Sequence, residues 1–432
     1  MLSTFARAFR TPDLRRKLLF TLLIMVLYRL GTFIPAPGVN YETLQKQTSQ
    51  TNDQGGVFGL LDLFSGGGLT NLSVFALGIM PYITASIIIQ LLRVVIPRFE
   101  VLHKEGQAGQ TKMTQYTRYL TLGLAVLQST TTITTARNGM LFGSHEATSV
   151  VQEGAVSIGL MILAMTAGTG VIMWMAELIT ERGVGNGMSL LIFTSIVARF
   201  PSSMWSIAGG RNGFMNFIIV VAALLLLIGM ISFVEQSQRR IPVQYAKRMV
   251  GRRTLGGSST YIPIKINMAG VIPVIFSSSI LSLPQTVAMF SSDQGSGWAR
   301  WIGIYMRHDS WVYLTFYALL IIFFCFFYTS ITFNPQEVSD NMKKYGGFIP
   351  GIRAGRPTAE YLQHVMTRIN TPGSLYLAIV ALIPSVLFIS IGISDHMAFG
   401  GTTLLIIVGV GLDTVKQIDS QLQQRHYEGF LR

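Results

Sequence analysis

Apolar stretches long enough to cross a lipid bilayer recur along the whole chain. A membrane-spanning helix needs about 20 mostly apolar residues, and stretches that reach or approach this length occur ten times in the 432 residues. Only 12% of the residues are Asp, Glu, Lys or Arg, about half of the ~25% that is usual in a soluble domain. We therefore predict an all-α integral membrane protein with about ten spans. The predicted spans are residues 18–34, 74–96, 116–136, 155–179, 188–200, 214–234, 268–287, 311–333, 374–393 and 400–415.

The distribution of basic residues predicts how these spans are oriented. Lys and Arg concentrate in the cytoplasmic loops of membrane proteins. With the N-terminus in the cytoplasm, 26 of the 33 basic residues fall in cytoplasmic segments and six in outside loops, while Arg29 lies within the first span. Such an imbalance predicts that both termini are cytoplasmic.

The predicted spans fall into two groups of five, one on each side of residue 200. Two halves with an odd number of spans must enter the membrane from opposite sides, as in an inverted repeat. We therefore predict an N-terminal half over residues 1–200 and a C-terminal half over residues 201–432. Two cytoplasmic loops of the second half, residues 235–267 and 334–371, are longer than a connection needs, and such loops are usually functional.

The sequence contains no pattern typical of a catalytic or metal site. Its single cysteine, Cys325, lies in an apolar run, and its six histidines do not form the H-E-x-x-H spacing of a zinc enzyme. The glycine-rich GVGNG at residues 183–187 lacks the lysine and the strand of a phosphate-binding loop. We therefore expect no enzyme, no cofactor and no metal. A secondary transporter of small solutes stays open as an alternative, although such proteins usually carry charged groups near the centre of the membrane.

The residues from Phe64 read FSGGGLTNLSVFALGIMPYITASIIIQLL. Three consecutive glycines do not form a stable lipid-facing helix, and irregular backbone at membrane depth is tolerated only inside a protein. This stretch resembles the plug and second helix of the SecY family, the channel subunits of the protein-export translocon. Five further blocks resemble that family in the same order: FIPAPG (33–38), ERGVGNGMSLLIF (181–193), QRRIPVQYAKR (238–248), IPIKINMAGVIPVIF (262–276) and NPQEVSDNMKKYGGFIPGIRAGRPT (334–358). Ala354 departs from the family pattern, in which a proline is expected.

The resemblance implies a clamshell of two halves around a central pore. Such a channel passes unfolded secretory polypeptides across the bacterial cytoplasmic membrane and releases hydrophobic segments sideways into the lipid. A ring of aliphatic side chains seals the pore, because an apolar constriction excludes water. By resemblance the ring consists of Ile79, Ile83, Ile192, Ile275 and Ile406. For any one of these residues, packing against lipid or core is the alternative.

The same resemblance implies a plug and a lateral gate. The plug covers residues 57–71, and an ordinary surface loop is the alternative. The gate lies between the second and seventh spans, where a hydrogen bond between Gln90 and Asn267 can hold the seam shut; bonding of each residue to backbone or water is the alternative. The plug residues are Phe64, Ser65, Gly66, Gly67, Gly68, Leu69, Thr70 and Asn71, and the gate residues are Ile87, Gln90, Asn267 and Ile272.

Basic residues on the two long cytoplasmic loops are candidates for partner docking. They are Arg239, Arg240, Lys247, Arg248 and Arg353. Arginine binds RNA phosphate and carboxylate equally well, although membrane topology and attraction to anionic lipids also favour basic loops. The resemblance implies as partners SecE and SecG, the SecA ATPase, the ribosome through its RNA, the nascent polypeptide with its signal sequence, and anionic lipids.

Overall fold

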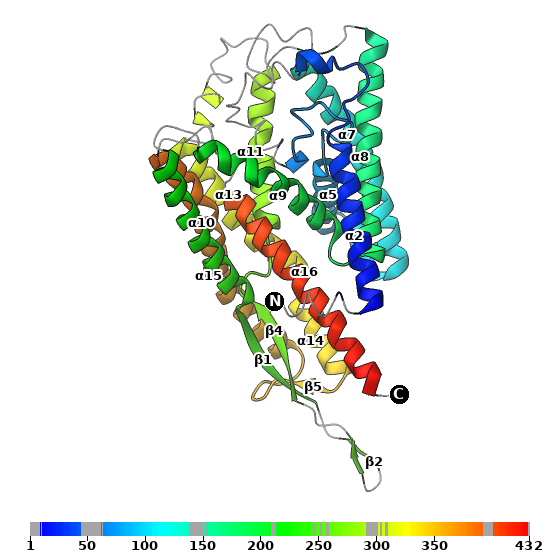
Figure 1. Cartoon of the computed structure of the whole chain (residues 1–432). Helices are drawn as coiled ribbons and strands as arrows, with labels where there is room; N and C mark the ends of the chain where they lie inside the picture. Colours follow the sequence, from blue (N-terminus) through cyan, green and yellow to red (C-terminus); the bar gives the residue numbers. More distant parts are fainter. Residues whose placement is uncertain are drawn as a thin grey trace. The chain divides into compact units, whose positions relative to one another are not determined.

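The computed structural model describes residues 9, 11–44, 62, 64–137, 151, 154–208, 213–245, 248–250, 253–255, 259–290, 301–302, 305–306, 310–391 and 401–430. Over these residues the chain is mostly α-helical, with a few short strands (Figure 1). Ten helices overlap the ten predicted spans, and α6 and α14 are additional short helices. The helices are α2 (Pro12–Gly31), α5 (Met80–Val95), α6 (Pro97–Lys104), α7 (Gln107–Arg137), α8 (Ala155–Arg182), α9 (Gly187–Ala208), α10 (Gly213–Gln236), α11 (Ile272–Phe290), α13 (Trp311–Thr332), α14 (Pro335–Lys344), α15 (Arg356–Ile391) and α16 (Gly401–Phe430).

Five stretches of helix are long and apolar enough to cross a membrane by length and composition, within the described residues. Shorter apolar stretches lie in α5, α9 and α11. The coarse prediction of a mostly helical, multi-pass membrane protein therefore agrees with the structure, while the number of ten crossings stays a prediction. The five long stretches are Ala155–Arg182, Phe214–Gln236, Trp311–Lys344, Arg356–Ser390 and Gly401–Gln423.

Helix α7 is rich in threonine, which lowers its hydropathy without leaving its hydroxyl groups unpaired. Thr117, Thr121 and Thr132 each donate a hydrogen bond to the carbonyl oxygen four residues earlier, at 3.0, 2.7 and 2.9 Å. Polar groups in lipid must find partners within the protein, and this back-bonding supplies them. The threonines are therefore compatible with the predicted third span.

The described chain forms two compact units. One consists mainly of Met1–Val220 with Val410–Arg432, and the other mainly of Val221–Gly392 with Phe399–Gly409. The boundary between these units falls inside α10 rather than at residue 200. The division into inverted halves at that residue stays a prediction.

In the first unit, the segment after α2 lies beside the segment before α5. The Ala36 amide donates to the Leu72 carbonyl and the Val74 amide to the Ile34 carbonyl, both at 2.9 Å. The FIPAPG block therefore braces the backbone that precedes α5. Side chains from this region pack into a core with α7 and α8, which consists of Ala36, Leu44, Leu69, Leu72, Ala76, Ile133, Ala136, Val151, Met161 and Met165.

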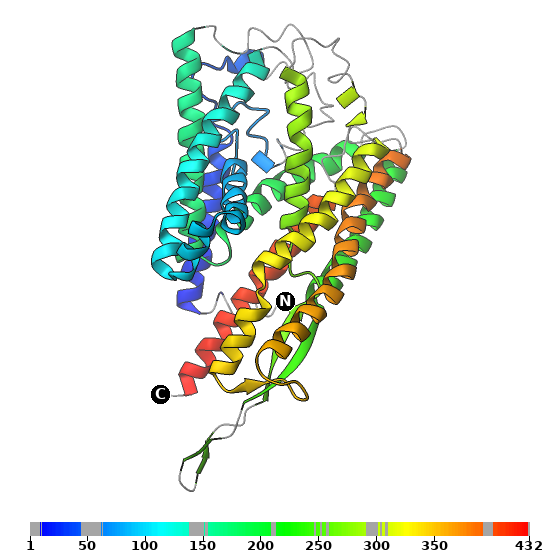
Figure 2. The ribbon, with the colours of Figure 1, turned by 180° about the vertical axis from the view of Figure 1, so that it is seen from behind.

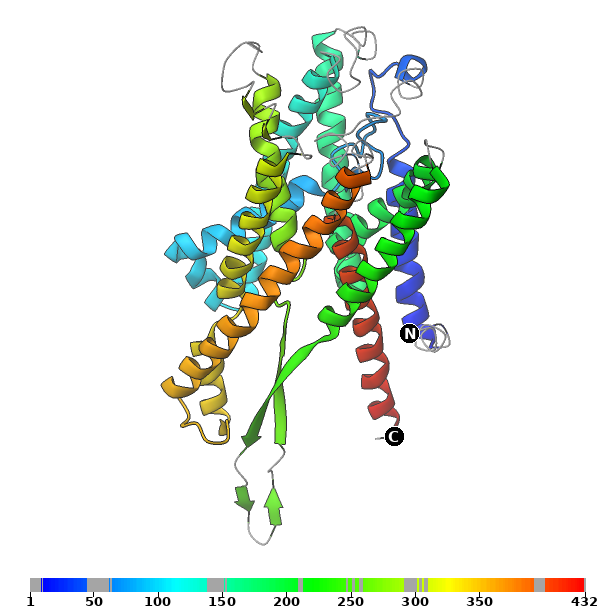
Figure 3. The same cartoon turned by 90° about the vertical axis from the view of Figure 1, so that its left-hand side faces the viewer.

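In the second unit, α10 leads directly into a strand with alternating burial. Strand β1 (Gln238–Tyr245) exposes Arg240 and Pro242 and buries Ile241 and Val243, which is the period-two pattern of a sheet with one covered face. It pairs antiparallel with β4 (Ser259–Lys265). Figure 3 shows the two strands side by side below the end of α10, with β2 (Arg248–Val250) and β3 (Arg253–Leu255) forming a small hairpin between them in sequence.

The second long loop packs onto this sheet. Strand β5 (Gly347–Phe348) joins the free edge of β1 through the pairs Gln244↔Phe348 and Tyr245↔Gly347. Helices α13 and α15 run side by side (Figure 2) and α14 packs against α15. The two loops predicted separately therefore share one apolar core, which consists of Ile241, Val243, Ile264, Met342, Ile349, Leu362, Val365 and Met366.

Candidate channel, gate and docking sites

The glycine-rich segment forms a series of tight turns before α5, which begins at Met80. Residues 64–69 are buried, which favours a plug held inside the protein over an exposed surface loop. Gly66 and Gly67 have φ of +67° and +93°, the left-handed region that glycine adopts without steric cost. The predicted plug spans residues 57–71, of which residues 57–61 and 63 lie outside the described part.

Two arginines from neighbouring helices contact this segment. Arg29 of α2 donates through Nη1 to the carbonyl oxygen of Gly66. Arg199 of α9 forms an ion pair through Nη2 with Oδ2 of Asp62 and donates to Oγ1 of Thr70 at 2.9 Å. Sequence reasoning did not assign these arginines to the plug. The sequence did contain one indication of their importance: a charged residue within or beside a membrane span is costly and commonly functional.

The five isoleucines of the predicted pore ring are distributed over both units. Ile79, Ile83 and Ile192 belong to the first unit, and Ile275 and Ile406 to the second. Ile79 and Ile406 are 0% and 1% exposed, Ile192 and Ile275 are also buried, and Ile83 is partly exposed. Four of the five are thus packed against protein, which disfavours a lipid-facing role. Their arrangement as one ring stays a prediction.

The predicted gate residues also come from both units. Ile87 is buried and Gln90 half-buried on α5, and Ile272 is the first residue of α11. Ile87 and Gln90 are three residues apart, so they lie on adjacent positions of one helix face. The bond between Gln90 and Asn267 stays a prediction.

Asn267 is 3% exposed and is held by its own unit. Its Nδ2 donates to Oε1 of Glu235 at 2.5 Å and to the carbonyl oxygen of Gly270 at 3.2 Å. Its Oδ1 is buried and has no hydrogen-bond partner among the described residues. A buried acceptor without a partner is costly. A side chain that donates a hydrogen bond to Oδ1 would therefore stabilise this arrangement.

Three of the predicted docking residues lie on the sheet formed by β1, β4 and β5 or on the turn before α15. Arg239 and Arg240 are exposed on β1, and the guanidinium of Arg240 lies 4.8 Å from the ring centroid of Tyr261 on β4. Arg353 is exposed, and its carbonyl oxygen accepts a hydrogen bond from Thr358 Oγ1 at 2.9 Å. Arg248 is the first residue of β2, and Lys247 lies outside the described residues.

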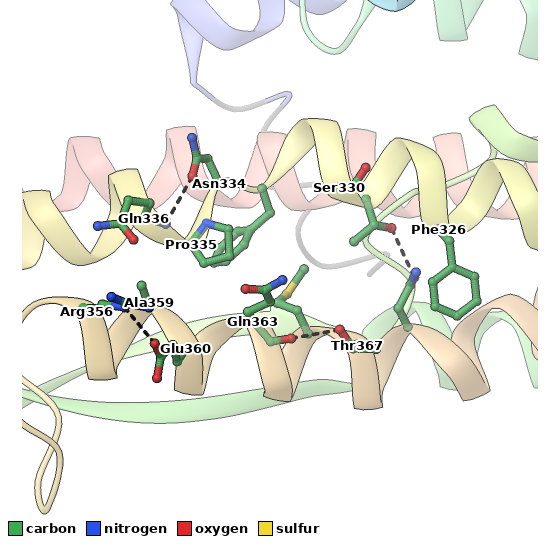
Figure 4. Close-up of a pocket in the computed structure, with 14 residues that line it drawn as sticks. Phe326, Ser330, Asn334, Pro335, Gln336, Arg356, Ala359, Glu360, Gln363 and Thr367 are labelled. Carbon is green, nitrogen blue, oxygen red and sulfur yellow. Dashed lines mark hydrogen bonds and ion pairs between the residues drawn. The ribbon is translucent and has the colours of Figure 1, made fainter. Parts of the chain in front are cut away.

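A cavity of about 490 Å³ lies between the end of α13, the start of α14 and the first turns of α15 (Figure 4). Its polar lining is mostly amide and hydroxyl groups; Thr329 Oγ1 donates to Asn370 Oδ1 at 3.1 Å, and Arg356 pairs with Glu360 at 3.0 Å. The lining contains no nucleophile beside a general base, as covalent catalysis requires. Nor do the described residues contain a cluster of three or more side chains suited to a metal.

The fold and these sites together define a multi-pass membrane protein that encloses irregular, glycine-rich backbone. The family model for SecY matches residues 73–415. The chain is 59% identical over 438 aligned residues to the protein translocase subunit SecY of Streptomyces scabiei and 54% identical over 443 to that of Mycobacterium tuberculosis, with 100% of each chain covered in both cases. The chain belongs to the SecY family.

Solved structures agree with this assignment at the level of the fold. The structure of a protein-conducting channel is similar, with a TM-score of 0.60 and 17% identity, over 93% of this chain and 91% of that one. Sec61 in the canine ribosome–channel complex is similar over the same fractions, with a TM-score of 0.59. The predictions of a SecY-type, protein-conducting channel subunit in the bacterial cytoplasmic membrane, and of no enzyme, are therefore confirmed.

Proposed function

We propose that this chain moves unfolded secretory polypeptides through its centre and releases hydrophobic segments sideways into the cytoplasmic membrane. The observation that carries this proposal is the buried glycine-rich segment, residues 64–69, in the first unit. A helical membrane protein has no structural need for such a segment, because irregular backbone at membrane depth must be sheltered. A movable plug explains why the segment is retained.

The fold in this proposal has ten spans in two inverted halves, which form a clamshell around the pore with both termini in the cytoplasm. The ten helices that overlap the predicted spans support this arrangement, as does the excess of basic residues in the predicted cytoplasmic segments. The odd number of spans in each half gives the halves opposite orientation.

The pore closes around the polypeptide at the isoleucine ring. Branched aliphatic side chains form a dry, deformable constriction, which excludes ions when empty because water leaves a narrow apolar pore. The burial of Ile79, Ile192, Ile275 and Ile406 supports this assignment, since lipid-facing side chains would be exposed in the isolated chain. The plug blocks the pore when no polypeptide is present.

Lateral release requires a seam that opens. The seam runs between α5 and α11 and is held by Gln90 and Asn267. The unpaired Oδ1 of Asn267 supports this assignment, because the Gln90 amide is a suitable donor for it. A hydrogen bond between membrane helices contributes about 0.6–2 kcal/mol, a free energy that a hydrophobic signal helix can offset by entering the lipid.

The sheet of β1, β4 and β5 and the loop before α15 face the cytoplasm. Together they form one docking surface for the components that deliver the polypeptide. Arg239, Arg240 and Arg353 are exposed there, on backbone fixed by a shared apolar core, so guanidinium groups are presented for phosphate or carboxylate. The proposed partners are the SecA ATPase and the ribosome, together with SecE and SecG in one complex and anionic lipids around it. Because the chain has no nucleotide-binding motif of its own, the energy for transport comes from these partners.

A substitution in the ring tests the proposed function. Replacing Ile406 by Asn puts a polar group into the dry constriction, which lowers the barrier to water and loosens the closed state. We expect the reconstituted complex to export a precursor with a defective signal sequence, which the unmodified complex rejects. The exposed Leu226→Asn on α10 is the control. Rejection of the defective precursor by the Ile406 variant, or equal export by the control, would falsify the assignment.

A further inference from the structure

We propose that Arg199 of α9 is a positioning residue that holds the plug in its resting place, together with Arg29 of α2 and the acidic partner Asp62. This inference rests on the proposed role of the plug and adds the side chains that retain it. Arg199 lies outside the glycine-rich segment in the sequence, beyond the isoleucine of the pore ring on the same helix.

The guanidinium of Arg199 contacts the plug segment at two points. Its Nη2 pairs with the Asp62 carboxylate and donates to Thr70 Oγ1 at 2.9 Å. Asp62 in turn accepts the Thr70 amide through Oδ1 at 2.9 Å, and its carbonyl oxygen accepts the Gly67 amide at 2.9 Å. One guanidinium and one carboxylate thus hold both ends of the turn between residues 62 and 70.

The glycines allow the two arginines to lie directly against the backbone. A Cβ atom at Gly67 would be 3.0 Å from Nε and Nη2 of Arg199. A Cβ atom at Gly66 would be 2.9 Å from Nη1 of Arg29 and 3.2 Å from the Cα of Ser195. All of these distances are shorter than ordinary van der Waals contacts. A Cβ atom at either position would therefore displace the arginine that lies against it, and it would also strain the backbone at positive φ.

The charges of Arg29, Arg199 and Asp62 make the resting position of the plug sensitive to the loss of the Asp62 carboxylate. Arg29 experiences the positive charge of Arg199 as well as the negative charge of Asp62. Removing Arg199 leaves Arg29 and Asp62, a compensated pair. Removing Asp62 leaves two guanidinium groups that repel each other with little screening, because the surroundings are partly buried. Loss of the acid should therefore release the plug more than loss of Arg199.

Arg199 is not needed to join its own helix to α2. The hydroxyl groups of Tyr28 and Ser195 are 2.7 Å apart and already connect the two helices, and the ring of Tyr28 stacks on Phe75 with centroids 6.1 Å apart. The two helices therefore have a connection that does not involve the plug. This separation predicts that loss of Arg199 affects gating more than folding.

The exposure of the ion pair sets the expected size of the effect. The side chains of Arg199 and Asp62 are 33% and 13% exposed, between the exposed pairs that contribute little and the buried pairs whose disruption is severe. We expect Arg199→Gln to raise the resting ion conductance about tenfold, the factor that corresponds to ~1.4 kcal/mol. The Asp62→Asn variant should exceed it, and Arg199→Lys, which keeps the charge, should fall below it.

The test measures potassium chloride conductance of the reconstituted translocase complex in planar bilayers without substrate. Arg118→Gln is the matched control, because Arg118 forms an ion pair with Glu177 at 2.6 Å that joins α7 to α8 in the same unit. A second comparison uses Gly66→Ala against Gly106→Ala. Both glycines have positive φ, +67° and +74°, but a Cβ atom at Gly106 meets no atom within 4 Å. Only the Gly66 variant should raise the conductance.

Deletion of residues 62–71 tests the role of the plug separately from the role of Arg199. If the deletion raises conductance while Arg199→Gln stays within about twofold of the unmodified complex, the plug stands and the role of Arg199 is wrong. If the deletion also leaves conductance unchanged, the plug itself is wrong. Failure of both Arg199 variants to assemble into a protease-resistant complex would make Arg199 a folding residue and would also overturn the inference.

Discussion

Asn267 is the single residue on which the proposed seam depends most. It is buried at the start of the segment leading to α11. Its amide nitrogen donates one hydrogen bond to Glu235 and one to the Gly270 carbonyl oxygen. Those bonds fix the orientation of the side chain, which leaves Oδ1 as the acceptor available to a partner. An amide fixed in this way can contribute to a gate, because its unpaired oxygen is held in one direction and can accept a hydrogen bond from a partner on another helix.

Replacing Asn267 by Leu should lower the hydrophobicity that a signal helix needs for integration into the membrane. The substitution removes an interhelical bond of about 0.6–2 kcal/mol from the closed seam. The measurement is the integrated fraction of a series of signal helices with increasing leucine content. Asn341→Leu, at an exposed site on α14, is the control for added hydrophobicity.

The Glu235→Gln variant tests whether an effect of the Asn267 variant comes from the proposed seam bond with Gln90 or from the local bond between Asn267 and Glu235. A glutamine at 235 still offers a carbonyl oxygen to the Asn267 amide, so the fixed orientation is kept and the threshold should stay near that of the unmodified chain. An unchanged threshold in the Asn267 variant would rule out the seam bond. An equal change in the Glu235 variant would assign the effect to the local contact instead.

Single residues also mark the limit of sequence reasoning at this scale. The glycines of the proposed plug and four of the five isoleucines of the proposed ring could be named from the sequence, because they lie within contiguous motifs that resemble the SecY family. Arg29 and Arg199 could not be connected to Asp62, since they come from segments separated by more than thirty and one hundred residues and hydropathy carries no information on pairing. Their position within or beside apolar spans was the only available signal.

At the scale of elements, α15 differs most from its predicted bounds. The span was predicted at residues 374–393, whereas the helix begins at Arg356. Its first turns bury Leu362, Val365 and Met366 in the apolar core that they share with β1 and β4, with the three-to-four-residue spacing of an amphipathic helix. Hydropathy detects only the lipid-embedded part of such a helix, because the preceding turns are half polar.

The three-stranded sheet of β4, β1 and β5 could not be predicted for a related reason. Strands β1 and β4 have the alternating pattern of a hairpin, but β5 is two residues long and pairs with β1 through Gln244 and Phe348. Such a long-range pairing leaves no periodic signal in so short a strand. The structure thus shows one packed element, with a shared apolar core, where two separate loops were predicted.

Reversing the charge of Arg353 should impair docking without unfolding this element. Arg353 is exposed and its backbone is held by Thr358 and the sheet core, so Arg353→Glu should leave the protease resistance of this packed element unchanged. We expect export driven by the SecA ATPase to fall about tenfold, as for a lost charge-assisted contact of ~1.4 kcal/mol. The measurement is ATP-dependent transport into vesicles.

Lys344→Glu provides the matched comparison, because it makes the same charge change at an exposed position on α14 in the same unit. Transport should fall far less in this variant. Equal losses in the two variants would show that net charge, rather than the position of Arg353, determines the effect. Normal transport in the Arg353 variant would exclude the docking assignment.

At the scale of the whole molecule, the class of protein followed from composition, charge and contiguous motifs. The positions of the helices agree with the apolar stretches because lipid imposes the same requirement on each span. The relation between the two units does not follow from such local signals. The inverted halves, the ring and the seam depend on that relation, which is why they are proposals about the assembled channel.

The most direct test of the account is photo-crosslinking of a stalled nascent polypeptide to the chain within its complex. A crosslinker at Ile79 or at Ile275, which belong to different units, should give an adduct with the same translocating chain. Crosslinkers at Leu163 and Leu226, which are 67% and 69% exposed, should react with lipid instead. Adducts at both isoleucines and neither leucine are predicted. Adducts that favour the leucines, or that are absent from either isoleucine, would contradict a polypeptide pore between these residues.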